Sequence, residues 1–170
     1  MKSRAVILAV TLLSVFGFTT TAVAQDAVRE VRGPIWINVP TSATVLQSIK
    51  VKAPASGNIT ITVTGTMVYE HTLGNEGEYC LQLSTTPRNT GGCGPDLGSD
   101  SAIRSFIAAD TPSTVPHFGA SEQYSIVRTF PVTAGTTYTF YLNGYQGGLD
   151  SGWLFQPAMT ALYISGTLEP

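Results

Sequence analysis

The sequence predicts an all-β fold: a single antiparallel β-sandwich, jelly-roll-like, of about eight strands. The main observation is that apolar and polar residues alternate over many short segments after residue 24, which is the periodicity of half-buried strands. Turn segments rich in glycine, proline and asparagine separate these runs. No segment in this part shows the 3.6-residue periodicity of a helix of three turns.

The clearest strand is the segment 59–64, Ile-Thr-Ile-Thr-Val-Thr, in which the β-branched apolar residues share one face and the threonines share the other. Gly65 follows it and predicts a β-bulge before a short continuation at 67–69. The other predicted strands are 35–39, 44–52, 78–85, 102–108, 123–132, 136–143 and 158–165. Three irregular stretches are expected between them, at 86–100, 109–121 and 143–157.

The first 24 residues have the three parts of a cleavable secretory signal peptide. Lys2 and Arg4 supply the positive start, Ala5–Phe18 is apolar, and Ala22-Val23-Ala24 is a small-x-small cleavage triplet. The apolar run is shorter than the about 20 residues that a membrane-spanning helix needs. We therefore expect cleavage before Gln25, one domain over 25–170, no later membrane span, and a secreted or periplasmic location.

Charge is sparse in the predicted mature chain. Of the nine basic residues, Lys2 and Arg4 lie in the signal peptide, so residues 25–170 carry seven basic and eleven acidic residues, a net charge of −4. The basic residues form no cluster along the sequence. Nucleic acid and anionic membranes are therefore not expected partners, because both require a concentrated positive field.

The two cysteines, Cys80 and Cys93, are predicted to form a disulfide, because an exported chain with an even cysteine count favours pairing. A bridge that closes a loop of this length contributes about 3 kcal/mol in the chain-entropy model. A zinc site is the competing interpretation, and the absence of histidines at ligand spacing disfavours it.

Calcium is the one metal that the sequence suggests. Asp96 and Asp100 lie in a glycine-containing loop with Ser99, and hard oxygen ligands at alternating loop positions are what Ca²⁺ prefers. The segment is not a twelve-residue EF-hand loop, and polar loops of this kind are also ordinary turns. No other cofactor is expected.

Catalytic signatures are lacking in the sequence. His71 and His117 accompany neither a Gly-x-Ser-x-Gly nor a His-Glu-x-x-His motif, and both are interpreted as solvated polar residues at strand ends or loops. Several carboxylates are available for an acid–base pair, but no two of them are singled out by spacing. We therefore expect a protein that is not an enzyme, with a hydrolase of unrecognised site as one alternative.

The stretch 143–157 is the most distinctive segment. It places Tyr145, Trp153 and Phe155 among glycines and amide side chains, and aromatic side chains on loops are recurrent contact residues. The alternative is that Trp153 and Phe155 fold inward and cap the sandwich.

The preferred interpretation is an exported domain that binds carbohydrate or an extracellular protein through these three aromatics. The rival is a structural or assembly subunit of an extracellular or cell-surface complex. The sequence does not determine the oligomeric state.

Overall fold

The computed structural model describes residues 28–72, 77–88, 90, 102–107 and 117–164. Within these ranges the chain forms nine strands and no helix, which confirms the all-β prediction. The strands are β1 (Val28–Arg32), β2 (Trp36–Asn38), β3 (Thr44–Lys52), β4 (Gly57–Thr72), β5 (Gly77–Ser84), β6 (Ala102–Ile107), β7 (His117–Val132), β8 (Thr137–Gly147) and β9 (Ser151–Ile164). None of the described residues belongs to a helix that could cross a membrane.

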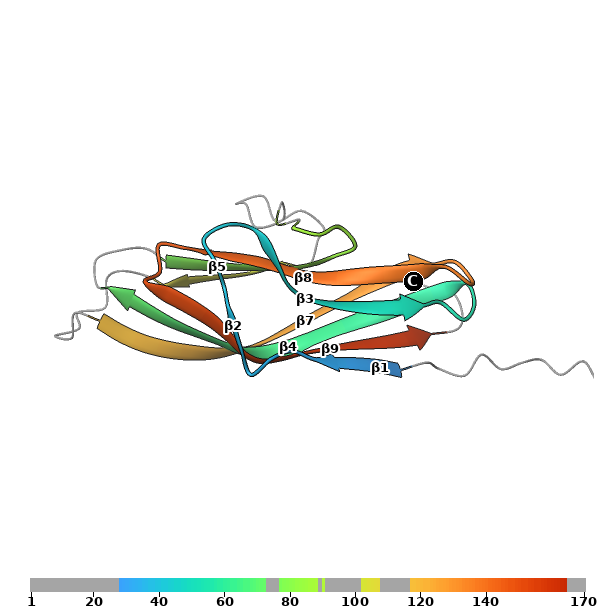
Figure 1. Cartoon of the computed structure of the whole chain (residues 1–170), viewed down its shortest axis with the longest axis horizontal. Helices are drawn as coiled ribbons and strands as arrows, with labels where there is room; N and C mark the ends of the chain where they lie inside the picture. The colour runs from blue at the N-terminus through green and yellow to red at the C-terminus, as the bar shows by residue number, and fades with distance from the viewer. Residues whose placement is uncertain (1–27, 73–76, 89, 91–101, 108–116, 165–170) are drawn as a thin grey trace, which may run out of the picture.

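The strands form two antiparallel sheets that lie as two layers along the long axis (Figure 1). Sheet A has the order β1-β9-β4-β7, with β2 also paired to β9, and sheet B has the order β3-β8-β5-β6. From β2 onward, every connection except that from β5 to β6 passes from one sheet to the other. This is the jelly-roll arrangement that the sequence predicts. Because β1 and β2 share one edge position beside β9, the topology has eight strand positions.

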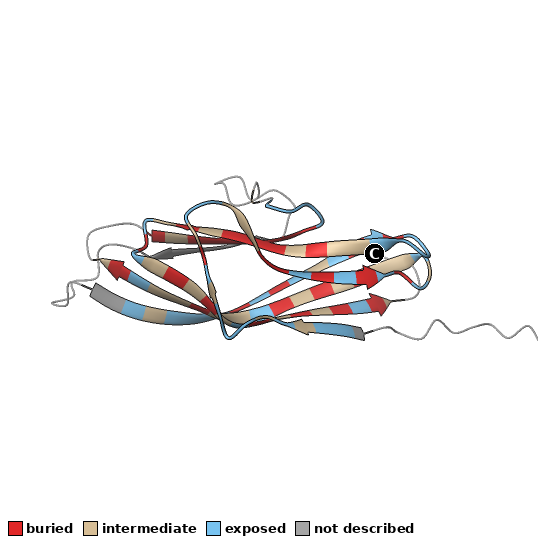
Figure 2. Cartoon of the chain, in the orientation of Figure 1, coloured by how far each residue is buried: buried red, intermediate tan, exposed pale blue. Residues whose placement is uncertain are grey.

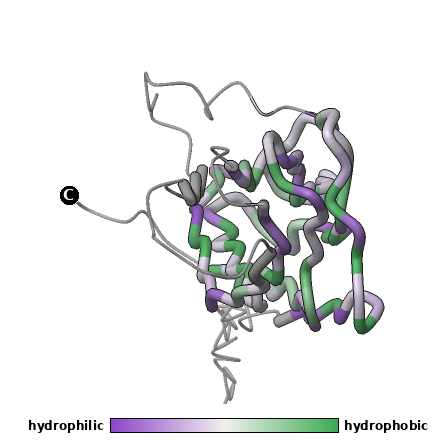
Figure 3. Tube along the Cα trace, turned by 90° about the vertical axis from the view of Figure 1, so that its left-hand side faces the viewer, coloured by the Kyte–Doolittle hydropathy of each residue, from purple (hydrophilic) through white to green (hydrophobic). Residues whose placement is uncertain are grey.

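The core lies between the sheets and is built by the predicted alternation. Ile59, Ile61 and Val63 in β4 are each 0% exposed, while the residues between them are half-buried. Buried and less buried residues alternate along the strands (Figure 2), as do hydrophobic and hydrophilic ones (Figure 3). Phe130 of sheet A meets Phe140 of sheet B with 4.8 Å between ring centroids. Each fully buried large apolar side chain of this kind stabilises the fold by about 1.5–3 kcal/mol.

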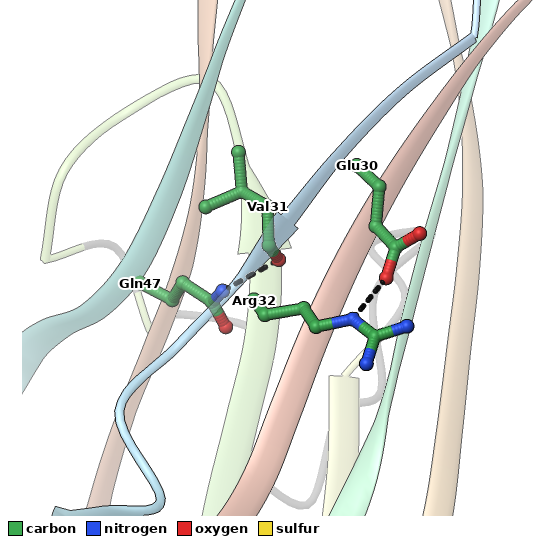
Figure 4. A network of polar contacts seen from close by, with 4 residues as sticks. All are labelled: Glu30, Val31, Arg32 and Gln47. Atoms are coloured by element: carbon green, nitrogen blue, oxygen red, sulfur yellow. Dashed lines mark hydrogen bonds and ion pairs between the residues drawn. The ribbon is translucent and has the colours of Figure 1, made fainter.

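Polar side chains close the two long sides of the sandwich. On one side, the Gln47 amide of β3 donates a hydrogen bond of 3.0 Å to the Val31 carbonyl of β1 (Figure 4). On the other, a guanidinium nitrogen of Arg128 in β7 donates to the Leu83 carbonyl of β5 at 2.9 Å. Both bonds join an edge strand of one sheet to a strand of the other, which fixes the two layers against each other.

Two boundary predictions need correction. The stretch 109–121 is not irregular throughout, because β7 begins at His117 and pairs with β4 from there to Val132. Small residues such as Gly119 and Ala120 do not show the alternation of apolar and polar side chains that predicts a strand, so only their pairing with β4 shows that they are extended. The runs 59–64 and 67–69 belong to one strand, and the register shift predicted at Gly65 is present, although the additional residue lies in β9.

Some predictions fall on residues outside the described ranges. These are the signal peptide over 1–24, the disulfide partner Cys93, and the calcium candidates Asp96 and Asp100. Cys80 itself is 0% exposed in β5, on the face of sheet B that points away from Leu81 and the core.

Candidate contact surface on the outer face of sheet A

Trp153 and Phe155 lie on the outer face of sheet A. Leu154 between them is 0% exposed and belongs to the core, whereas the two aromatics are half-buried and stand outside the core cluster. The loop predicted over 143–157 is wrong, because β8 continues to Gly147 and β9 begins at Ser151. The two side chains are therefore held by a paired strand, and they neither cap the sandwich nor lie on a loop.

Two glycines of this segment lie where other atoms approach the backbone closely, Gly144 against neighbouring strands of its own sheet and Gly152 against the opposite sheet. A Cβ atom on Gly144 would lie 2.7 Å from Leu46 Cδ1, and one on Gly152 would overlap the hydroxyl of Tyr79. The Tyr79 side chain, 0% exposed, crosses the sandwich and donates a hydrogen bond of 2.8 Å to the carbonyl of Val68. Glycine within a strand often marks such a close approach. From sequence alone these glycines predict a loop, because glycine is also typical of loops.

Three apolar side chains from three strands of sheet A line a hollow of about 270 Å³, which we call the apolar hollow. They are Trp36 of β2, Val68 of β4 and Trp153 of β9. Val68 and Trp153 are direct partners in the β4–β9 register. Trp36 is the register partner of Phe155, with 4.7 Å between the two ring centroids. The aromatic surface is therefore continuous across neighbouring strands.

The exposed part of this surface was not predictable from local sequence. Trp36 is 53% exposed and its neighbour Ile35 is 62% exposed. The run Ile35–Val39 is apolar apart from Asn38, and such a run by itself favours a buried strand. Only the pairing of β2 with β9 shows that Trp36 joins Trp153 and Phe155.

Tyr145 does not belong to this surface. It lies in β8 of sheet B, paired with Cys80 of β5, and its hydroxyl donates to Glu78 Oε1 at 3.3 Å. The three aromatics predicted as one ligand-binding set are therefore divided between two sheets. The aromatic that lies beside Trp153 and Phe155 is Trp36.

Two further hollows, of about 520 and 640 Å³, flank Gln156 on the same outer face. They share Thr64 and Gln156 and extend in opposite directions across the strands. At the border of the first hollow, an ion pair joins Arg32 Nε to Glu30 Oε1 at 2.7 Å, so that the two charges compensate each other (Figure 4). The residues that line these hollows are Glu30, Arg32, Gly33, Ile35, Thr64, Gly65, Thr66, Gln123, Tyr124, Ser125, Phe155, Gln156, Pro157, Ala158 and Thr160.

The structure places one of the two histidines in the interior of the sandwich. His71 is 0% exposed inside β4, so the interpretation of it as a solvated residue is wrong. Its strand continues the inward alternation of Met67, which is why the imidazole faces the interior. Asp96 and Asp100 lie outside the residues that the structure describes, and for His117 the structure describes the backbone alone. Within the described part, no group of three or more His, Cys, Asp and Glu side chains could hold a metal ion.

Buried tyrosines are also unsuited to proton transfer near neutral pH. Desolvation by burial raises the pKa of Tyr79 and of Tyr124 well above the ordinary value of a phenol. Both hydroxyls therefore remain protonated at any physiological pH, and their contribution is packing and, for Tyr79, hydrogen bonding.

Comparison with known proteins gives structural matches at low identity and low TM-score. No family model matches the chain, and no curated protein matches it. The VP2 subviral particle of infectious bursal disease virus is 12% identical with a TM-score of 0.44, and the match covers 94% of this chain and 38% of that one. Eiger TNF from S. frugiperda is 10% identical with a TM-score of 0.29, over 83% of this chain and 96% of that one. A Desmodium yellow mottle tymovirus chain is 9% identical with a TM-score of 0.29, over 100% and 99%. This chain thus spans well under half of the first of these structures, and similarity at these scores carries no argument about function.

Proposed function

We propose that this chain is an exported, non-enzymatic assembly domain, whose copies associate through the apolar hollow. The observation that carries the proposal is the exposure of Trp36 beside Trp153 and Val68 on the outer face of sheet A. Large aromatics exposed together on a soluble domain mark contact surfaces, and aromatic residues are enriched in the centres of protein interfaces. The hollow is lined by apolar side chains, so it suits an apolar side chain of a protein partner.

The charges around the hollow favour a second copy as that partner. Asn38 and Thr66, which pair in register with Trp153 and Phe155, are uncharged, and Glu30 further along the face is compensated by Arg32. Glu70, two residues after Val68 on the same outer face of β4, accepts a hydrogen bond of 2.8 Å from the Ser151 hydroxyl. Two identical faces therefore meet with this hydrogen-bonded carboxylate at the border of each hollow, although residues 25–170 carry a net charge of −4. Such self-complementary contact of one patch with its copy is the usual basis of twofold homodimers.

Sedimentation velocity of the purified chain over a wide concentration range tests the proposal. We expect association that Trp153→Ser and Trp36→Ser each weaken by about 2 kcal/mol, roughly 30-fold in Kd, as for aromatic interface anchors. Val127→Ser is the matched control, because Val127 is 54% exposed on sheet A but does not line the hollow. A chain that stays monomeric at every concentration, or one in which Val127→Ser acts as strongly as the tryptophan variants, would refute the proposal.

A further inference from the structure

The middle of β9 contains a bulge that projects one side chain from the outer face of sheet A. In the β4–β9 register, Thr64 pairs with Ala158 and Thr66 with Phe155, so that Gln156 and Pro157 stand opposite Gly65 alone. Gln156 has a φ of 48°, in the left-handed region. That conformation costs a residue with a Cβ about 1–2 kcal/mol, and glycine adopts it without this cost.

The bulge is held by the connection between β1 and β2. The Gln156 N–H donates to the Ile35 carbonyl at 2.8 Å, and the Gly33 N–H donates to the Pro157 carbonyl at 2.9 Å. Gly33 is needed there because a Cβ would lie 2.9 Å from Pro157 Cγ. The backbone at Gln156 and Pro157 is therefore hydrogen-bonded, while the side chain of Gln156 is exposed. Strained residues that the surrounding structure holds in place are found preferentially at binding sites.

Gln156 is the boundary shared by the two hollows of about 520 and 640 Å³. Together the hollows run from β1 across β9 and β4 to β7, which is three strand spacings or about 14 Å. Each volume is within the range of small-molecule sites, about 300–1,000 Å³. The groove therefore suits an extended molecule that crosses the strands and passes Gln156.

The groups that line this groove specify the chemistry of its occupant. Hydroxyls come from Thr64, Thr66, Ser125 and Thr160, and amides come from Gln123 and Gln156. These groups donate and accept hydrogen bonds without charge. The Phe155 ring supplies an apolar face at the border of the groove. Because Glu30 and Arg32 compensate each other, the groove favours neither an anion nor a cation.

We propose that the groove across Gln156 binds a neutral glycan, with Phe155 stacking on a sugar face and the Gln156 amide bonding sugar hydroxyls on both sides. The strain at Gln156 supports this assignment, since glycine would occupy the bulge more stably but would remove the shared amide. The glycan site goes beyond self-assembly. No residue that lines the groove also lines the apolar hollow, but Phe155 contacts Trp36 of the hollow, so Gln156→Gly rather than Phe155→Ala separates the two proposals.

The test is a glycan array followed by isothermal titration calorimetry with the purified chain. The probes are neutral hexasaccharides of β-linked glucose, xylose, mannose and N-acetylglucosamine, with hyaluronan oligosaccharide as the anionic comparison. We expect at least one neutral hexasaccharide to bind. Gln156→Gly and Phe155→Ala should each weaken that binding at least tenfold, and Gln156→Asn, which keeps an amide and tolerates the left-handed conformation, should retain more of it than Gln156→Gly.

Thermal melting and sedimentation separate the two proposals. Gln156→Gly should melt no lower than the parent chain and should associate as the parent does, so that a loss of glycan binding reports on the groove alone. Val127→Ser serves again as the exposed control on the same sheet. The glycan assignment is overturned if no neutral hexasaccharide binds, if hyaluronan binds as tightly, or if Gln156→Gly binds as the parent does.

Discussion

Gly152→Ala tests the packing that supports the contact surface from inside. Tyr79 reaches across from sheet B, and its hydroxyl donates to the carbonyl of Val68, whose side chain lines the apolar hollow. A Cβ on Gly152 would overlap the Tyr79 hydroxyl and lie 2.6 Å from Tyr79 Cζ. The ring therefore has to move, although it is 0% exposed and packed within the core cluster.

The expected cost has two parts. Overpacking a dense core costs about 1–3 kcal/mol. The displaced hydrogen bond to Val68 adds about 1 kcal/mol. Gly152→Ala should therefore lower the free energy of unfolding by about 2–4 kcal/mol, measured by equilibrium urea denaturation. Gly119→Ala is the matched control, because its nearest neighbour would be the Tyr69 carbonyl oxygen at 3.7 Å, an ordinary contact.

Tyr79→Phe provides the second half of a double-mutant cycle. It removes the hydroxyl that meets the new methyl group but leaves the ring carbons in place, so relief is partial. We expect Gly152→Ala to cost about 1 kcal/mol less in the Tyr79→Phe background than in the parent. Additive effects, or a Gly152→Ala variant as stable as the parent, would show that Tyr79 does not occupy the space above Gly152.

Three further predictions concern other parts of the chain. Within the described residues the buried Tyr124 hydroxyl has no hydrogen-bond partner, so Tyr124→Phe should leave stability unchanged or raise it by about 1 kcal/mol; a clear loss in denaturation would reveal a partner. Cys80 and Cys93 should give no free thiol in an Ellman assay, and Cys93→Ser should cost about 2–5 kcal/mol; two titratable thiols would disprove the bridge. Intact-mass spectrometry of exported protein should show a chain that begins at Gln25, and retention of Met1 would contradict the signal peptide.

Much of the strand content followed from local pattern. The alternation in 59–64 and in 78–85 assigns an inner and an outer face without knowledge of any partner, because a strand places successive side chains on opposite faces. The same rule failed where glycine and small residues replace the apolar ones. Gly119, Gly144 and Gly152 lie in strands because their backbones pair with neighbouring strands, and that information is not local.

The sequence by itself therefore determined the fold class and the approximate positions of most strands, and it singled out Trp153 and Phe155 as candidate contact residues. Only the tertiary structure decided which aromatics lie together. Trp36 and Phe155 are neighbours because β2 pairs with β9. Tyr145 is close to Phe155 in sequence, but it lies in β8 and therefore in the other sheet. The physical reason is that strand pairing is set by the burial of whole sheet faces, so residues distant in sequence share a surface while near neighbours are separated by the core.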